Sequence, residues 1–139
     1  MQDRFKFRIF DTENKTMHNT DFVVCSTGFV GKLETEDDGK FYVDNYNLTI
    51  DNKCILMQCT GLKDKNGKLI FEGDIVKFRK LVLDGDFFRK TDAKSYITYL
   101  DGCFCIADEL LPRALNANVL KDLEVIGNIH ETPELLEVK

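Results

Sequence analysis

The chain has 139 residues, of which 43% are hydrophobic and 31% charged, a balance typical of one globular domain or one domain with a small lobe. Its net charge of −5 argues against general nucleic-acid binding, which needs Lys and Arg against phosphates. Residues 1–10 lack the apolar core of a secretory leader, and the longest apolar runs are too short to span a membrane. We therefore expect a cytoplasmic protein whose five cysteines are reduced.

The first part of the chain predicts short strands. Phe5, Phe7 and Ile9 alternate with charged residues, which is the period of a strand with one buried face. Turn-forming residues 11–15 and a second strand over residues 17–25 complete an N-terminal hairpin. Gly28 and Gly31 are expected to interrupt the strand pattern. Further elements expected here are an acidic loop at 34–39 and a strand pair carrying Phe41, Val43, Leu48 and Ile50 around Asp44-Asn45.

The second part predicts longer strands joined by tight turns. Asn66-Gly67 and Asp101-Gly102 are strong hairpin signals, because these residues accept positive φ. The expected strands are 54–58, 69–71, 75–82, 94–100, 102–107 and 123–129. Residues 84–92 are interpreted as a polar loop, and a short helix is expected within 110–120, with Pro112 near its start.

These elements predict a mainly β fold. The order of turn, long strand, hairpin, short helix and last strand favours an SH3-like small barrel over residues 53–139. Residues 1–52 are expected to form an N-terminal β-hairpin lobe. The two parts can also form one continuous domain.

Four sequence blocks resemble the YopX family. They are residues 7–11, 57–68, 72–76 and 125–136, in the family's order and across nearly the whole chain. The resemblance implies a small protein encoded by phages or prophages of Gram-positive bacteria, acting in the host cytoplasm, with no assigned enzymatic activity. Phe10 replaces a usual Trp, Cys59 an aromatic residue and His130 a Tyr, and we interpret these departures as changes in packing.

Cysteine and histidine could form a metal site. Cys103 and Cys105 are predicted to share a strand face, and Cys54 and Cys59 are separated by four residues, so zinc is one interpretation. Structural zinc usually uses Cys-x-x-Cys knuckles in turns, so small buried core residues are the favoured interpretation. His18 and His130 lack a nearby nucleophile and are weak candidates for a catalytic base.

Acidic and glycine-rich motifs give no specific site. Asp84, Asp86 and Asp92 lack the spacing of a calcium-binding EF-hand loop, and the glycines match neither a P-loop nor a dinucleotide fingerprint. We therefore expect no catalytic residue, no metal and no cofactor.

Phe87, Phe88, Arg89 and Lys90 form the candidate binding segment. Two adjacent Phe residues point in opposite directions if the chain is extended. A loop folded over its own barrel is the favoured interpretation. The alternative is an exposed aromatic beside cations, which suits a protein interface or single-stranded nucleic acid.

The leading hypothesis is a non-enzymatic protein-interaction module that forms a homo-oligomer and binds an unidentified host or phage protein, but no membrane. Exposed sheet edges favour such self-association. The competing hypothesis is a nucleic-acid-binding accessory protein, although the net charge disfavours it. It would use six cations on neighbouring strands: Lys63, Lys65, Lys68, Lys77, Arg79 and Lys80. An enzyme would need a pocket with convergent polar groups, which the sequence does not indicate.

Overall fold

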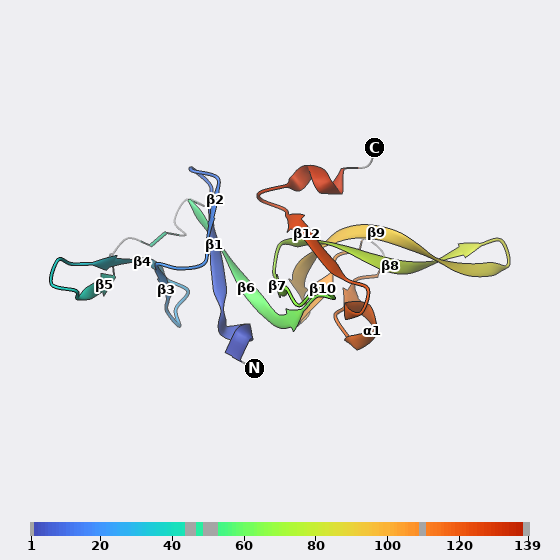
Figure 1. Ribbon diagram of the computed structural model, residues 1–139, viewed down its shortest axis with the longest axis horizontal. Helices are drawn as coiled ribbons and strands as arrows, with labels where there is room; N and C mark the ends of the chain where they lie inside the picture. Colours follow the sequence, from blue (N-terminus) through green and yellow to red (C-terminus); the bar gives the residue numbers. More distant parts are fainter. Residues whose placement is uncertain (1, 44–46, 49–52, 109–110, 138–139) are drawn as a thin grey trace. The chain divides into compact units, whose positions relative to one another are not determined.

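The computed structural model describes residues 2–43, 47–48, 53–108 and 111–137, and confirms a mainly β fold with one short α-helix (Figure 1). The chain divides into two compact units, residues 7–57 and residues 1–6 with 58–139. The boundary expected between residues 52 and 53 adjoins residues outside the described ranges and stays a prediction. Among the described residues, no helix is long and apolar enough to cross a membrane.

The unit of residues 7–57 contains the expected N-terminal hairpin. β1 (Phe7–Asp11) pairs in antiparallel fashion with β2 (Thr16–His18), and β6 (Cys54–Lys63) lies on the other side of β1. Ile9 and Phe10 are buried. The first strand was expected to include Phe5, but β1 begins only at Phe7. Phe5 is exposed and belongs to the 3₁₀ helix η1 (Gln2–Phe5) of the other unit.

The remaining strands of this unit differ from the prediction. The single strand expected over residues 17–25 is two strands, β2 and β3 (Phe22–Val24), because Asp21 takes a positive φ of 68° that extended chains do not allow. Gly31 does not interrupt a strand but lies within β4 (Val30–Thr35). β4 is central in a sheet with β3 and β5 (Phe41–Val43). Leu48, expected in the strand that pairs with Phe41 and Val43, lies in a turn. Asp44, Asn45 and Ile50, the other residues of that expected strand pair, lie outside the described residues.

The other unit is built on a five-stranded sheet that curls into a half barrel. Its strand order is β11 (Arg113–Ala114), β10 (Cys103–Ile106), β9 (Phe87–Leu100), β8 (Asp74–Asp84) and β12 (Glu124–Asn128). The Asp101-Gly102 turn joins β9 to β10 as expected. The SH3-like detail of the barrel stays a prediction.

Short elements complete this unit. The expected Asn66-Gly67 hairpin joins β6 to β7 (Leu69–Phe71). The expected short helix is α1 (Ala117–Leu120), but Pro112 does not lie at its start; the Asn116 side chain caps it by accepting from the N–H groups of Asn118 and Val119. A 3₁₀ turn, η3 (Pro133–Leu136), follows β12.

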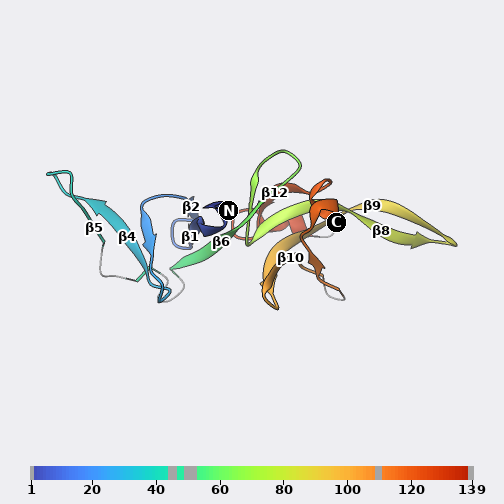
Figure 2. The same cartoon turned by 90° about the horizontal axis from the view of Figure 1, so that it is seen from below.

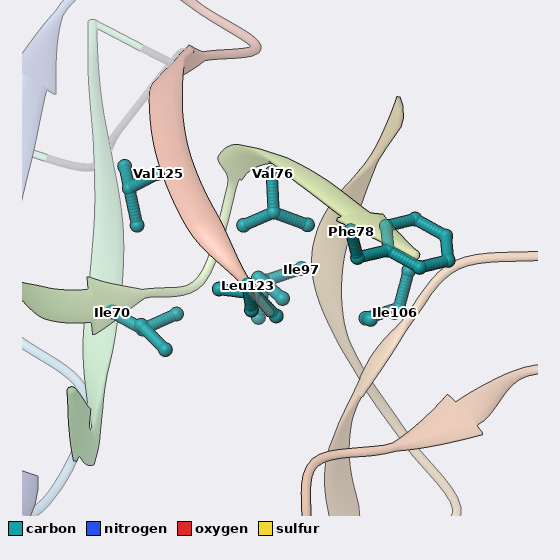
Figure 3. Close-up of a cluster of buried hydrophobic side chains, with 7 residues drawn as sticks. All are labelled: Ile70, Val76, Phe78, Ile97, Ile106, Leu123 and Val125. Carbon is teal, nitrogen blue, oxygen red and sulfur yellow. The ribbon is translucent and has the colours of Figure 1, made fainter. Parts of the chain in front are cut away.

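A cluster of buried side chains forms the core of this unit (Figure 3). Val76 and Phe78 alternate along one face of β8, and Leu123 lies below them at the entry to β12. The full cluster consists of Ile70, Val76, Phe78, Ile97, Ile106, Leu123 and Val125. It therefore fixes the base of the β8–β9 hairpin but reaches no further than Phe78.

Two buried carboxylates hold the central turns. One oxygen of Asp64 accepts from the N–H groups of Asn66 and Lys68, both at 2.9 Å, and the other accepts from Val125 at 2.9 Å. Asp74 accepts from the Phe71 N–H at 2.8 Å. Both acids therefore serve the turn architecture around β7.

The expected polar loop at residues 84–92 is wrong. Only Gly85 and Asp86 form a turn, and β9 begins at Phe87 and continues for 14 residues. Gly85 has a φ of 64°, while Asp86 is not among the residues of positive φ, which fits a type II′ hairpin turn with Gly in its first central position. The candidate binding segment is therefore a strand.

Candidate protein-interaction surface

The β8–β9 hairpin extends beyond the strands that pair with its two edges. On one side β12 pairs only with residues 74–77 of β8, and on the other β10 pairs only with residues 97–100 of β9. Among the described residues, 78–96 therefore form a two-stranded ribbon, here called the arm, with no further strand at either edge. It extends as a twisted ribbon beyond the other strands of its unit (Figures 1 and 2).

The end of the arm exposes large apolar side chains. Phe87 is 79% exposed and Phe88 is 71% exposed, so the interpretation of a loop folded over the barrel is wrong. Because adjacent strand residues point to opposite faces, Phe87 and Phe88 lie on opposite faces of the arm. Leu83 pairs with Phe88 across the ribbon, and Leu81 lies two residues before Leu83, so these three side chains share a face. Leu81 and Leu83 are also exposed.

Charged side chains on the arm pair with one another. Arg89 Nε lies 2.8 Å from an Asp84 oxygen, and Arg79 Nε lies 3.5 Å from an oxygen of Asp92. Lys77, the residue just before the arm, lies 3.8 Å from the other Asp92 oxygen. These pairs are exposed, so each contributes about 0–1 kcal/mol. They leave the apolar end of the arm close to neutral, as suits a protein contact.

A cationic hollow lies beside the base of the arm. It has a volume of about 430 Å³, and its lining includes the cations Arg79, Lys90 and Arg113 and the carboxylate of Asp122. The Arg113 guanidinium lies 5.7 Å from the centre of the Phe78 ring, a distance at which cations and aromatic rings attract each other. Three cations and one carboxylate give the hollow a net positive charge, which favours an anionic group over a cationic one.

The six cations of the nucleic-acid hypothesis are split between elements. Lys63, Lys65 and Lys68 belong to the β6–β7 hairpin, where Lys65 pairs with Glu124 at 3.4 Å. The other three follow β8, where Lys80 points to the face opposite Lys77 and Arg79.

A second hollow lies in the unit of residues 7–57. Asp11, His18 and Lys32 are among its lining residues, and its volume is about 490 Å³. The Asp11 carboxylate accepts from the N–H groups of Glu13 and Asn14 and from the Asn14 side chain. The Asn14 hydrogen bonds are the main reason that the pKa of Asp11 lies below its ordinary value. Asp11 thus serves its own turn, and His18 contacts Thr16 at 3.0 Å.

The cysteines divide between core and surface. Cys59 and Cys105 are buried as expected, and Cys54 is half-buried. Cys103 is exposed, which corrects its interpretation as a core residue, and Cys25 is exposed as well. Burial raises the pKa of the Cys54 and Cys105 thiols. Across the described part of the chain, no three His, Cys, Asp or Glu side chains gather as metal ligands would.

Comparisons with known proteins place the chain in a family. The family model described as "YopX protein" matches residues 6–137. The chain is also similar to a solved structure, the crystal structure of protein EF1440 from Enterococcus faecalis, at 32% identity and a TM-score of 0.63, covering 95% of this chain and 97% of that one. No curated protein matches the chain.

Proposed function

The chain belongs to the YopX family, and from this premise we propose that it is a non-enzymatic protein-interaction module that self-associates through the arm. The family resemblance also implies a setting, an accessory protein of a phage or prophage in the host cytoplasm. The observation that carries the proposal is the exposure of Phe87 and Phe88 at the end of a ribbon that has no core of its own. Exposed aromatic residues clustered with other apolar side chains are typical of interface centres.

The non-enzymatic part of the proposal is supported by how the acidic side chains are used. Asp11, Asp64 and Asp74 all accept hydrogen bonds from nearby backbone, which holds turns in place. A general acid or base must instead face a substrate. The half-buried Cys54 and buried Cys105 thiols, with raised pKa values, are poor nucleophiles at neutral pH.

Sedimentation velocity of the full chain tests this proposal. We expect the average mass to rise with concentration from the micromolar toward the millimolar range. Phe87→Ser with Phe88→Ser should shift the distribution toward the monomer, since serine removes the apolar surface of the arm end. Leu111→Ser, which also changes a highly exposed residue but lies outside the arm, is the matched control. A wild-type chain that stays monomeric at the highest concentration would refute self-association.

Nucleic-acid binding is the second candidate function. Residues 77–94 contain six Lys and Arg and three Asp, so this segment is net +3 in a chain of net −5. Two-stranded ribbons enter DNA grooves in some proteins. Fluorescence anisotropy with labelled single- and double-stranded oligonucleotides at low salt separates the candidates. We expect no binding, and binding that weakens steeply with salt would favour the second candidate.

A further inference from the structure

The outer edge of β8 is open where the arm begins. β12 covers that edge only as far as Lys77, and the Arg79 carbonyl accepts from Arg113 Nη1 at 3.5 Å. Beyond Arg79, none of the described strands pairs with this edge. The stretch that no described strand covers is therefore Lys80-Leu81-Val82-Leu83-Asp84, here called the open stretch, although its Leu81 also lines the hollow that contains Arg113.

The register shows which backbone groups of this stretch face outward. A two-residue turn is closed by a hydrogen-bonded pair, here Asp84 with Phe87. Hydrogen-bonded and non-hydrogen-bonded pairs alternate along the ribbon, so Leu81 and Leu83 direct their N–H and C=O groups away from β9. Two observations agree with this alternation. Lys77, which the alternation also predicts to face outward, pairs with β12. The outward-facing carbonyl of Arg79 accepts a hydrogen bond from Arg113.

The side chains of the stretch are complementary to those of a second copy. It has a cation at its start, an anion at its end and three apolar residues between them. In an antiparallel pairing centred on Val82, Lys80 of each copy lies opposite Asp84 of the other. The outward-facing groups of Leu81 then meet those of the other copy's Leu83. Opposite charges directly across a ladder stabilise it, and like charges destabilise it.

The alternative register and the alternative edge fit less well. Centring the pairing on Leu81 places Lys80 opposite Val82, which loses both ion pairs and requires the Arg79 backbone. The free edge of β9 carries Arg89, Lys90, Asp92 and Lys94, and charged edges of this kind oppose strand pairing. Of the two edges of the arm, only the β8 edge has apolar residues at the centre of its open stretch.

We propose that two copies of this chain associate through this edge of β8, in antiparallel register about Val82, to form a four-stranded sheet from two arms. This proposal rests on the self-association proposed above and specifies its surface. Leu81, Leu83 and Phe88 of each copy then lie in adjacent rows on one face. Phe87 lies on the other face, so Phe88→Ser should weaken association more than Phe87→Ser. A contact confined to an arm buries less area than the standard interface of about 800 Å² per partner, so the dimer is weak.

Charge reversal tests the register. Lys80→Asp alone and Asp84→Lys alone each create two like-charge pairs in a homodimer, and we expect each to raise the dissociation constant about tenfold. The double variant restores the opposite pairing and should recover most of the wild-type affinity. An equimolar mixture of the two single variants should form heterodimers. Asp84→Lys also loses the ion pair with Arg89, so amide NMR spectra of each variant establish that the arm is intact.

Disulfide trapping tests the geometry independently. In the proposed dimer, Val82 of one copy lies opposite Val82 of the other in a non-hydrogen-bonded pair. The Cα atoms of such a pair lie about 4.5 Å apart, a distance that a disulfide spans. In a background with Cys25→Ser and Cys103→Ser, Val82→Cys should oxidise to a covalent dimer. Lys90→Cys, on the β9 edge, should remain largely monomeric.

The outcomes separate the two proposals. Charge rescue together with trapping at residue 82 supports the β8 edge. A wild-type chain that self-associates while the reversals have no effect and Val82→Cys does not crosslink overturns the β8 edge alone. A wild-type chain that stays monomeric overturns both proposals.

Discussion

Replacing Asp64 with Asn should destabilise the protein strongly, although the two side chains have nearly the same shape. The carboxylate accepts three backbone hydrogen bonds at 2.9 Å, two within the β6–β7 turn and one from Val125. An amide has a single acceptor oxygen, so it can serve either the turn or Val125, while its NH₂ group faces an N–H donor on the other side.

The magnitude follows from these contacts. A hydrogen bond to a charged group contributes about 1.5–3 kcal/mol, and a buried N–H left without a partner costs about 1–3 kcal/mol. We expect Asp64→Asn to lower the free energy of unfolding by about 2–4 kcal/mol, with a fall in Tm of roughly 5–15 °C for a chain of this size. Asp122→Asn, at an exposed position of the same unit, should stay within about 0.5 kcal/mol of wild type.

Urea unfolding followed by circular dichroism measures both variants, and pH gives a second test. Burial raises the pKa of Asp64, but the hydrogen bonds from Val125, Lys68 and Asn66 outweigh it and hold the pKa below the ordinary value of 3.8. A lowered pKa contributes stability above that ordinary value, and this contribution is lost as the pH falls through the folded-state pKa. The gap between wild type and Asp64→Asn should therefore narrow below about pH 4. A gap under about 0.5 kcal/mol at neutral pH would refute this role for the carboxylate.

Three further predictions concern packing and exposure. Leu123→Ala removes a fully buried core side chain and should cost about 2–5 kcal/mol in a urea melt, whereas Leu83→Ala, on the exposed arm, should cost little; equal losses would contradict the core assignment. Gly127→Ala should lower stability by about 1–3 kcal/mol in thermal melts, since the added methyl would collide with the side chains of Thr132 and Leu135, and an unchanged Tm would show that they yield. Thiol titration with an aromatic disulfide should find two fast-reacting and two protected cysteines, and equal rates would contradict the difference in burial between the two pairs. The fast pair is Cys25 and Cys103, and the protected pair is Cys59 and Cys105.

The sequence predicts hairpins best where local turn chemistry and a buried face agree. Asn66-Gly67 and Asp101-Gly102 both lie in the expected turns, because each joins strands that have a face in the core. Gly85-Asp86 is an equally favourable turn sequence, yet the sequence predicted a loop over all of residues 84–92. The reason is physical: both faces of the arm end meet solvent, so the alternation of apolar and polar residues that marks a strand is absent there. The Gly-Asp dipeptide was the one available signal.

The role of residues 87–90 as a binding segment stays a prediction, whereas the loop expected for them is a strand. Two adjacent Phe residues must diverge on an extended chain, and that inference holds, but both are exposed because the core ends at Phe78. The open edge of β8 could not be predicted from the sequence. It depends on where β12 stops pairing, which is a tertiary property. Cys103 and Cys105 show that burial, too, is a tertiary property. The strand period places both on one face, but it does not show how far the core extends beneath that face, and only Cys105 is buried.

Hydrogen exchange should distinguish the edge of the arm from its interior at single residues. A two-stranded ribbon is marginally stable without further strands, so its amides should exchange faster than that of Val76 in the core. Within the ribbon, the Val82 N–H faces Arg89 across the ladder, whereas the N–H groups of Leu81 and Leu83 face outward. If two arms pair through β8, raising the concentration should slow exchange at Leu81 and Leu83 far more than at Phe88, whose N–H faces outward from the opposite edge. Equal slowing at all three would show that the apolar faces associate rather than the strand edges.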